Sequence, residues 1–113
     1  MKERVDKPWG CYVDYFRTST VVFKKLMILN GQSISYQYHD LRDEVWHVTS
    51  GVGKITIDDR ESVMMAGDSI YIKKGQKHKM ECISEEPLAI FEMQMGETRE
   101  DDIVRLEDKY GRD

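Results

Sequence analysis

Residues 31–51, GQSISYQYHDLRDEVWHVTSG, contain three of the four side chains from which both the fold and the chemistry of this chain can be predicted. Gln37, His39 and Glu44 lie here between two glycines. An amide oxygen, an imidazole nitrogen and a carboxylate are all metal ligands. Because a β-barrel can bring such closely spaced side chains to one point, the stretch predicts one side of a metal site built on strands.

A second glycine-bounded stretch, GDSIYIKKGQKH over residues 67–78, ends in the fourth candidate ligand, His78. Two imidazoles, one carboxylate and one amide suit a divalent cation. Zn²⁺ is our first expectation, and Mn²⁺, Fe²⁺, Co²⁺ and Ni²⁺ are alternatives, because ligand type does not choose among them. The competing interpretation is a hydrogen-bonded polar core that holds no metal.

Short runs rich in β-branched and aromatic residues recur along the chain and are separated by Gly, Asp and Asn. Runs of this length and spacing are typical of an antiparallel sandwich or barrel. We therefore predict an all-β fold. The expected strands are Tyr12–Phe16, Val21–Leu29, Ile34–His39, Glu44–Thr49, Lys54–Asp58, Ser62–Met65, Ser69–Ile72, His78–Ile83 and Leu88–Met95.

The period-two alternation of strands places His78 on the same face as Met80 and Cys82, so His78 should point inward. Glu44 shares a face with Trp46, which predicts a carboxylate inside the barrel that needs a partner. His47 falls on the opposite face of that strand. One of Lys24 and Lys25 must also face inward, but the pattern does not say which.

Near the end of the chain, Glu92 and Gln94 alternate with Phe91, Met93 and Met95. Met93, like Met27 and Met80, is expected to fill the core. If the apolar set packs between the sheets, Glu92 and Gln94 face solvent, and we prefer this interpretation to a catalytic base.

The last residues have a different pattern. Thr98-x-x-Asp101 resembles a helix-capping box, and Ile103, Leu106 and Tyr110 follow at helical spacing before Gly111. We expect a short C-terminal helix or an ordered tail.

Length and composition limit the classes of function. A chain of 113 residues is expected to form a single domain over residues 1–113. A net charge of −4 gives no basic field for nucleic acid, so we expect no nucleic-acid partner. The longest apolar runs are too short to cross a bilayer and the charged start is unlike a signal peptide, so we expect no membrane association and a cytoplasmic location.

The two glycine-bounded stretches resemble the paired motifs of the cupin superfamily, which is a small jelly-roll barrel, or double-stranded β-helix, with a metal inside. The order Gln-x-His, Glu and a later His resembles the ligand set of phosphomannose isomerases. Residues 7–12, KPWGCY, and residues 101–112, DDIVRLEDKYGR, extend the similarity. Together they look like the C-terminal isomerase domain of bifunctional mannose-6-phosphate isomerase/mannose-1-phosphate guanylyltransferases. Cupins often pair through sheet edges, so a homodimer is also expected.

The resemblance implies the interconversion of mannose 6-phosphate and fructose 6-phosphate, with a sugar phosphate as the small-molecule partner. It implies a metal held by Gln37, His39, Glu44 and His78. Arg42 or Arg105 would hold the phosphate, and Glu92 is a candidate for the base that moves the proton.

Three positions depart from the pattern of that family, which has histidines where this chain has Asp40, Leu41 and Val45. They leave the metal ligands intact and affect the expected substrate recognition. The alternatives are therefore a non-catalytic, metal-dependent sugar-binding or regulatory cupin and another cupin enzyme, such as an oxygenase or an epimerase.

Overall fold

The computed structural model describes residues 3–99 and 101–107, and every regular element within them is a β-strand. The all-β prediction is therefore confirmed. The eleven strands are β1 (Glu3–Lys7), β2 (Gly10–Arg17), β3 (Val21–Ile28), β4 (Tyr36–Tyr38), β5 (Arg42–Ser50), β6 (Val52–Ile57), β7 (Arg60–Met65), β8 (Ser69–Ile72), β9 (His78–Cys82), β10 (Leu88–Gly96) and β11 (Val104–Glu107).

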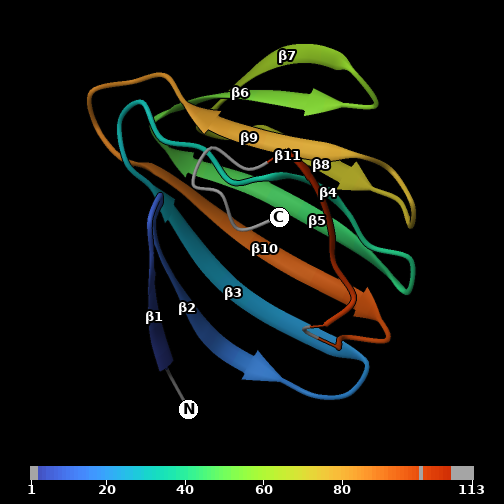
Figure 1. The fold of residues 1–113 in the computed structure, drawn as a ribbon. Coiled ribbons are helices and arrows are strands. Elements are labelled where there is room, and N and C mark those ends of the chain that lie inside the picture. Colours follow the sequence, from blue (N-terminus) through green and yellow to red (C-terminus); the bar gives the residue numbers. More distant parts are fainter. Residues whose placement is uncertain (1–2, 100, 108–113) are drawn as a thin grey trace.

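The strands form two antiparallel sheets that lie as two layers (Figure 1). One sheet has the order β1-β2-β3-β10-β5-β8, and the other has the order β11-β4-β9-β6-β7. The chain passes from one layer to the other several times, so strands far apart in sequence become neighbours. The described part of the chain offers no long apolar helix of the kind that crosses a membrane.

Each of the nine predicted runs overlaps a strand, and two strands were missed. The first, β1, has the sequence ERVDK and lies at a sheet edge, where charged side chains meet solvent and no apolar alternation is needed. The second, β11, lies in the segment for which a helix was one of our two expectations.

That helix is not formed within the described residues. Val104 and Arg105 instead pair with Tyr38 and Gln37 of β4, so β11 becomes the edge strand of its sheet. A few apolar residues at helical spacing are a weak signal, and the open edge of β4 supplies hydrogen bonds that override it. Tyr110 and Gly111, which also supported the helix, lie outside the described residues.

The core lies between the two sheets and is apolar over much of its extent. Ile28, Val48 and Ile90 come from one sheet, and Ile55 and Met80 come from the other, and all five have no exposed surface. Strands β3, β5 and β9 alternate buried and more exposed residues, as strands with one face on a core do.

The buried and exposed faces of β10 are exchanged relative to our preferred interpretation. Glu92 and Gln94 are 4% and 0% exposed, whereas Met93 is 40% exposed. Phe91 lies on the outer face, where its ring stacks on Phe23 at 5.4 Å between centroids. Alternation assigns residues to two faces but does not say which face is inside when one is polar and the other apolar. Solvent exposure of the polar pair and core packing of Met93 were therefore wrong predictions.

Gly51, which ends the first motif, is required by its backbone and by its surroundings. Its φ is +78°, and a Cβ there would lie 2.6 Å from the carbonyl oxygen of Pro87. Only glycine tolerates both conditions. The tight turn after β5 lets β6 start in the opposite sheet, directly after the strand that carries Glu44.

Candidate metal centre

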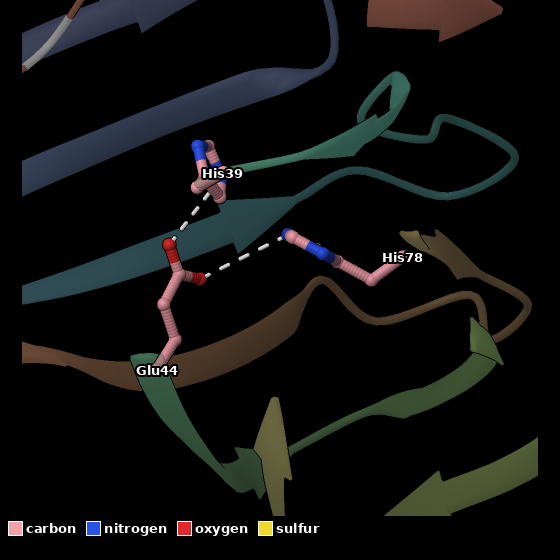
Figure 2. Close-up of side chains that lie close together, drawn as sticks. All are labelled: His39, Glu44 and His78. Atoms are coloured by element: carbon pink, nitrogen blue, oxygen red, sulfur yellow. Dashed lines mark ion pairs between the residues drawn. The ribbon is translucent and has the colours of Figure 1, made fainter. Parts of the chain in front are cut away.

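The predicted ligands come from three strands of both sheets. Glu44 projects from β5 of one sheet, whereas Gln37 and His78 are directly opposite each other in the β4–β9 pair of the second sheet. His39 follows immediately after β4. Figure 2 shows the side chains of His39, Glu44 and His78 pointing toward one another from these separate elements.

The distances confirm that these three side chains converge. His39 Nε2 lies 3.4 Å from Glu44 Oε2, and His78 Nε2 lies 3.9 Å from Glu44 Oε1. The three ligand atoms lie within 4.8 Å of one another, and all three residues are buried. Ligand bonds of about 2.1 Å keep two ligands of one ion within about 4.2 Å of each other. The two contacts with Glu44 meet this limit.

Both imidazoles are held in the tautomer that a metal requires. The Nδ1–H of His78 donates to the backbone carbonyl of Gln76 at 3.0 Å, and that of His39 donates to the carbonyl of Asp102 at 2.6 Å. A carbonyl only accepts, so each Nδ1 carries a proton, and in the neutral ring the lone pair is then on Nε2, the nitrogen nearer Glu44.

His78 Nε2 is a buried polar atom without a hydrogen-bond partner among the described residues. A buried nitrogen that is left unsatisfied costs free energy, so the site is incomplete as a purely hydrogen-bonded core. A cation at this point would satisfy the lone pair. This orphaned atom is the observation that favours a metal over the metal-free polar core.

Electrostatics keep His39 neutral. Burial, and after it the positive charge of Arg42, lowers the pKa of His39 to about 4. The Nε2 of His39 is therefore unprotonated at neutral pH and could bind a cation without the prior loss of a proton.

Glu44 is oriented by two donors. Arg42 Nε donates to Glu44 Oε2 at 2.8 Å, and the indole Nε1–H of Trp46 donates to Glu44 Oε1 at 2.8 Å. Alternation along β5 places all three side chains on the inner face, as was predicted for Glu44 and Trp46. Such donors fix the direction of a ligating carboxylate.

Gln37 lies beside this cluster with its amide oxygen turned away from it. Its oxygen accepts a hydrogen bond from Ser35 Oγ at 2.6 Å, and its Nε2 lies 3.3 Å from His39 Nε2. A half-turn of the amide exchanges the two ends, and the hydroxyl of Ser35 can accept as well as donate. Gln37 can therefore offer its oxygen only after that rotation, whereas His39, Glu44 and His78 are already aligned.

A cavity of about 110 Å³ opens beside the cluster. Gln37, His39 and Glu44 contribute to its wall, together with the candidate substrate residues Arg42, Glu92 and Arg105. All the predicted site residues except His78 therefore line one cavity. His78 lies behind Glu44 and His39, and the centroids of the two imidazole rings are 5.2 Å apart.

The wall formed by β3 and β10 carries a lysine opposite a carboxyl group. Lys24 and Glu92 are cross-strand neighbours, both are buried, and Lys24 Nζ lies 4.4 Å from the centroid of the Tyr12 ring. Gln94 Nε2 donates to Glu92 Oε2 at 2.6 Å. Burial, and after it the nearby charge of Glu44, raises the pKa of Glu92. The inward lysine that the sequence left open is thus Lys24.

The two candidate arginines differ in the hydrogen bonds that their side chains make. Arg42 uses its Nε on Glu44, and its other nitrogens lie 3.4 Å from the Arg99 carbonyl and 3.3 Å from His39 Nε2. Arg105 Nε, in contrast, is buried with no hydrogen-bond partner among the described residues. Of the two arginines, Arg105 is therefore the one with an unpaired donor inside the site.

The three departures from the family pattern lie away from this cavity. Asp40 and Leu41 are exposed, and Val45 lies on the outer face of β5 opposite Met93. None of the three is among the described residues that line the cavity. The residues that differ are thus not those that would face a ligand.

Sequence reasoning missed the contribution of Asp102 to this centre. Its carbonyl accepts the Nδ1–H of His39 across 63 positions of sequence, a contact that no local pattern encodes. The only available signal was its place in the C-terminal motif at residues 101–112.

Comparison with known proteins assigns the chain to a family. Residues 1–108 match the model of the family described as mannose-6-phosphate isomerase C-terminal. The chain is 34% identical over 113 residues to mannose-1-phosphate guanylyltransferase ManC of Salmonella typhimurium, covering 99% of this chain and 24% of that protein. It is 36% identical over 109 residues to mannose-1-phosphate guanylyltransferase of Escherichia coli, covering 96% and 23%. The chain thus spans about a quarter of the length of these relatives.

Solved structures support the fold. An RmlC-like cupin from Shewanella frigidimarina superposes with a TM-score of 0.77 at 20% identity, over 88% of this chain and 87% of that one. The predicted double-stranded β-helix is therefore confirmed. This chain has the cupin fold and belongs to the mannose-6-phosphate isomerase C-terminal family.

Proposed function

We propose that the protein is a metal-dependent sugar-phosphate isomerase that interconverts mannose 6-phosphate and fructose 6-phosphate. The observation that carries the proposal is the arrangement within one cavity. His39 and Glu44 of the candidate metal cluster, the buried carboxyl group of Glu92 and the unpartnered guanidinium nitrogen of Arg105 all line it. An aldose–ketose isomerase needs an electrophile, a base and a phosphate anchor, and each has a candidate among the described residues.

The ligand set would hold a divalent cation, Zn²⁺ in the first instance, with Mn²⁺, Fe²⁺, Co²⁺ and Ni²⁺ as alternatives. His39, Glu44 and His78 are aligned for it, and Gln37 would join after rotation of its amide. When bound, the cation supplies Lewis-acid polarisation of the sugar oxygens on C1 and C2.

Glu92 is our candidate for the base. Isomerisation removes the proton from C2 of the aldose and returns a proton to C1, so one carboxylate can accept and then deliver it. Its raised pKa makes the carboxylate a stronger base than an exposed glutamate. Lys24, directly opposite on β3, would favour the ionised carboxylate through its positive charge.

Arg105 would bind the phosphate and so orient the sugar toward Glu92. Arg42 was proposed for the same role from the sequence. Because its Nε already holds Glu44 within the ligand cluster, we propose that Arg42 acts on the phosphate only through its remaining nitrogens.

The test is proton exchange at carbon in heavy water. When mannose 6-phosphate is incubated with the metal-replete protein, the NMR signal of the sugar's C2 proton should disappear and fructose 6-phosphate should form. His78→Ala should lower the metal content and the exchange together, whereas His47→Ala, on the outer face of β5, should change neither.

The alternatives give different results. Tight binding of mannose 6-phosphate without exchange in metal-replete protein would replace the isomerase with a sugar-binding module. Absence of both binding and exchange would redirect the search to other cupin substrates. The outward placement of Asp40, Leu41 and Val45 favours the isomerase over both.

A further inference from the structure

The chain between β10 and β11 crosses from one sheet to the edge of the other, and Asp102 lies near the end of this crossing. Its carboxylate accepts two backbone hydrogen bonds, from Asp40 N–H at 3.1 Å and from Leu41 N–H at 2.9 Å. Its own carbonyl oxygen accepts the Nδ1–H of His39 at 2.6 Å. One half-buried residue therefore makes three hydrogen bonds to three consecutive residues, 39–41.

These three bonds are geometrically linked. The carboxylate holds the backbone that immediately follows His39, and this attachment fixes where the carbonyl of Asp102 lies relative to the His39 ring. Charge-assisted bonds from backbone N–H groups to a carboxylate are shorter and stronger than neutral ones. Removal of the carboxylate should therefore release the carbonyl as well, even though the carbonyl belongs to the backbone.

His78 provides a comparison within the same cluster. Its Nδ1–H donates to the carbonyl of Gln76, which lies two residues earlier, just before β9. The support of His78 is thus local and independent of the C-terminal segment. The support of His39 depends on a residue 63 positions away.

We propose that Asp102 is a positioning residue for the metal centre: its carboxylate clamps residues 40–41 and thereby holds its carbonyl against His39, which fixes the tautomer and orientation of that ligand. The proposal rests on the proposed metal centre for its functional meaning. It gives a role to the C-terminal motif DDIVR, which the isomerase proposal used only through Arg105. Substitution of a residue that hydrogen-bonds a metal ligand typically lowers metal affinity about 10- to 100-fold, so the expected effect is measurable.

The neighbouring Asp101 is a matched control. It is exposed, and its carboxylate pairs with the guanidinium of Arg99 at 2.9 Å. Asp101→Asn and Asp102→Asn make the same chemical change one residue apart. The substitution Asp102→Asn would keep one acceptor but place an NH₂ group against the second backbone N–H, and Asp102→Ala would remove both acceptors.

The first measurement uses metal-free protein and long-range ¹H–¹⁵N NMR of the histidine rings. Wild type and Asp101→Asn should show the Nδ1–H tautomer for His39. Asp102→Ala should show a mixture of tautomers for His39, with Asp102→Asn between them. His78 should keep the Nδ1–H tautomer in every variant. The second measurement is metal affinity by chelator competition, which should fall about 10- to 100-fold in Asp102→Ala and less in Asp102→Asn.

An unchanged His39 tautomer in both Asp102 variants would overturn the proposal. A change of tautomer in both His39 and His78 would also overturn it, because it would indicate a general disruption of the site. If Asp102→Ala does not fold, Asp102→Asn alone decides by the same criteria. A wild type that binds no metal would overturn the proposed metal centre. In that case the NMR result would still decide whether Asp102 positions His39.

Discussion

The two halves of β10 differ sharply in what they place between the sheets. In its first half Ile90 faces Val48 of β5, and both are fully buried within the apolar core. In its second half Glu92 and Gln94 face Trp46 and Glu44. The first half resembles the core of any small β-sandwich, whereas the second is a buried polar cluster, which costs free energy unless each group is satisfied. Stability and chemistry are therefore concentrated in different halves of one interior.

The largest effect is expected from Glu92→Gln, which keeps the shape of the side chain and removes the proposed base. Turnover of mannose 6-phosphate should fall about 10²- to 10⁴-fold, the usual contribution of a positioned acid or base. The midpoint of urea unfolding should stay the same or rise, because a buried ionisable group is replaced by a neutral one. Glu61→Gln, at an exposed position of β7, should leave both unchanged. Unaltered turnover in Glu92→Gln would remove Glu92 from the mechanism.

The opposite substitution is Ile90→Ala in the apolar half. It should lower the free energy of unfolding by about 2–5 kcal/mol, through lost burial and the cavity it leaves. The metal stoichiometry of the folded protein should not change. Val63→Ala, at a side chain that is 54% exposed, should cost less than about 0.5 kcal/mol. If Ile90→Ala abolished metal binding in protein that remains folded, the two halves would not be separable.

The polar half should also respond to pH. His39 has a folded-state pKa of about 4, below its unfolded value of about 6.5. Between these values the unfolded chain binds a proton that the folded protein excludes. The contribution of His39 to stability is therefore fully present above about pH 6.5 and is lost as the pH falls to about 4. At about 1.4 kcal/mol per pH unit this amounts to roughly 3 kcal/mol.

Urea unfolding of metal-free wild type and His39→Gln across this range measures the contribution of His39. The stability of wild type should fall more steeply with decreasing pH than that of His39→Gln. His47→Gln should follow the wild-type curve, since His47 lies on the outer face. Parallel curves for wild type and His39→Gln would show that His39 titrates normally in the folded protein.

The smallest effect is expected from Arg105→Ala. Loss of one phosphate contact should lower kcat/KM for mannose 6-phosphate about tenfold, about 1.4 kcal/mol, without changing the metal content. Arg42→Ala should differ from it by lowering metal affinity too, because Arg42 holds Glu44. Arg60→Ala, at an exposed position of β7, is the control. Equal effects of the two cavity arginines on metal content would contradict the division of roles.

Much of the centre could be predicted from the sequence because its key residues obey local rules. Glu44 and Trp46 share a strand face with period two, and His78 shares one with Met80 and Cys82, so their inward direction follows from chain geometry. The alternation of β3 likewise required one inward lysine. It could not choose Lys24 over Lys25, since the choice depends on which face of β3 meets the second sheet.

By itself, the sequence determined the all-β fold, the convergence of His39, Glu44 and His78, and the family. Tertiary structure alone decided the inward direction of Glu92, the pairing of β11 with β4 and the hydrogen bond from His39 to Asp102. The physical reason is the range of the interactions. Strand periodicity and turn chemistry act over a few residues, whereas the face that is buried, the edge that is paired and the carbonyl that meets an imidazole are set by segments brought together only when both sheets have formed.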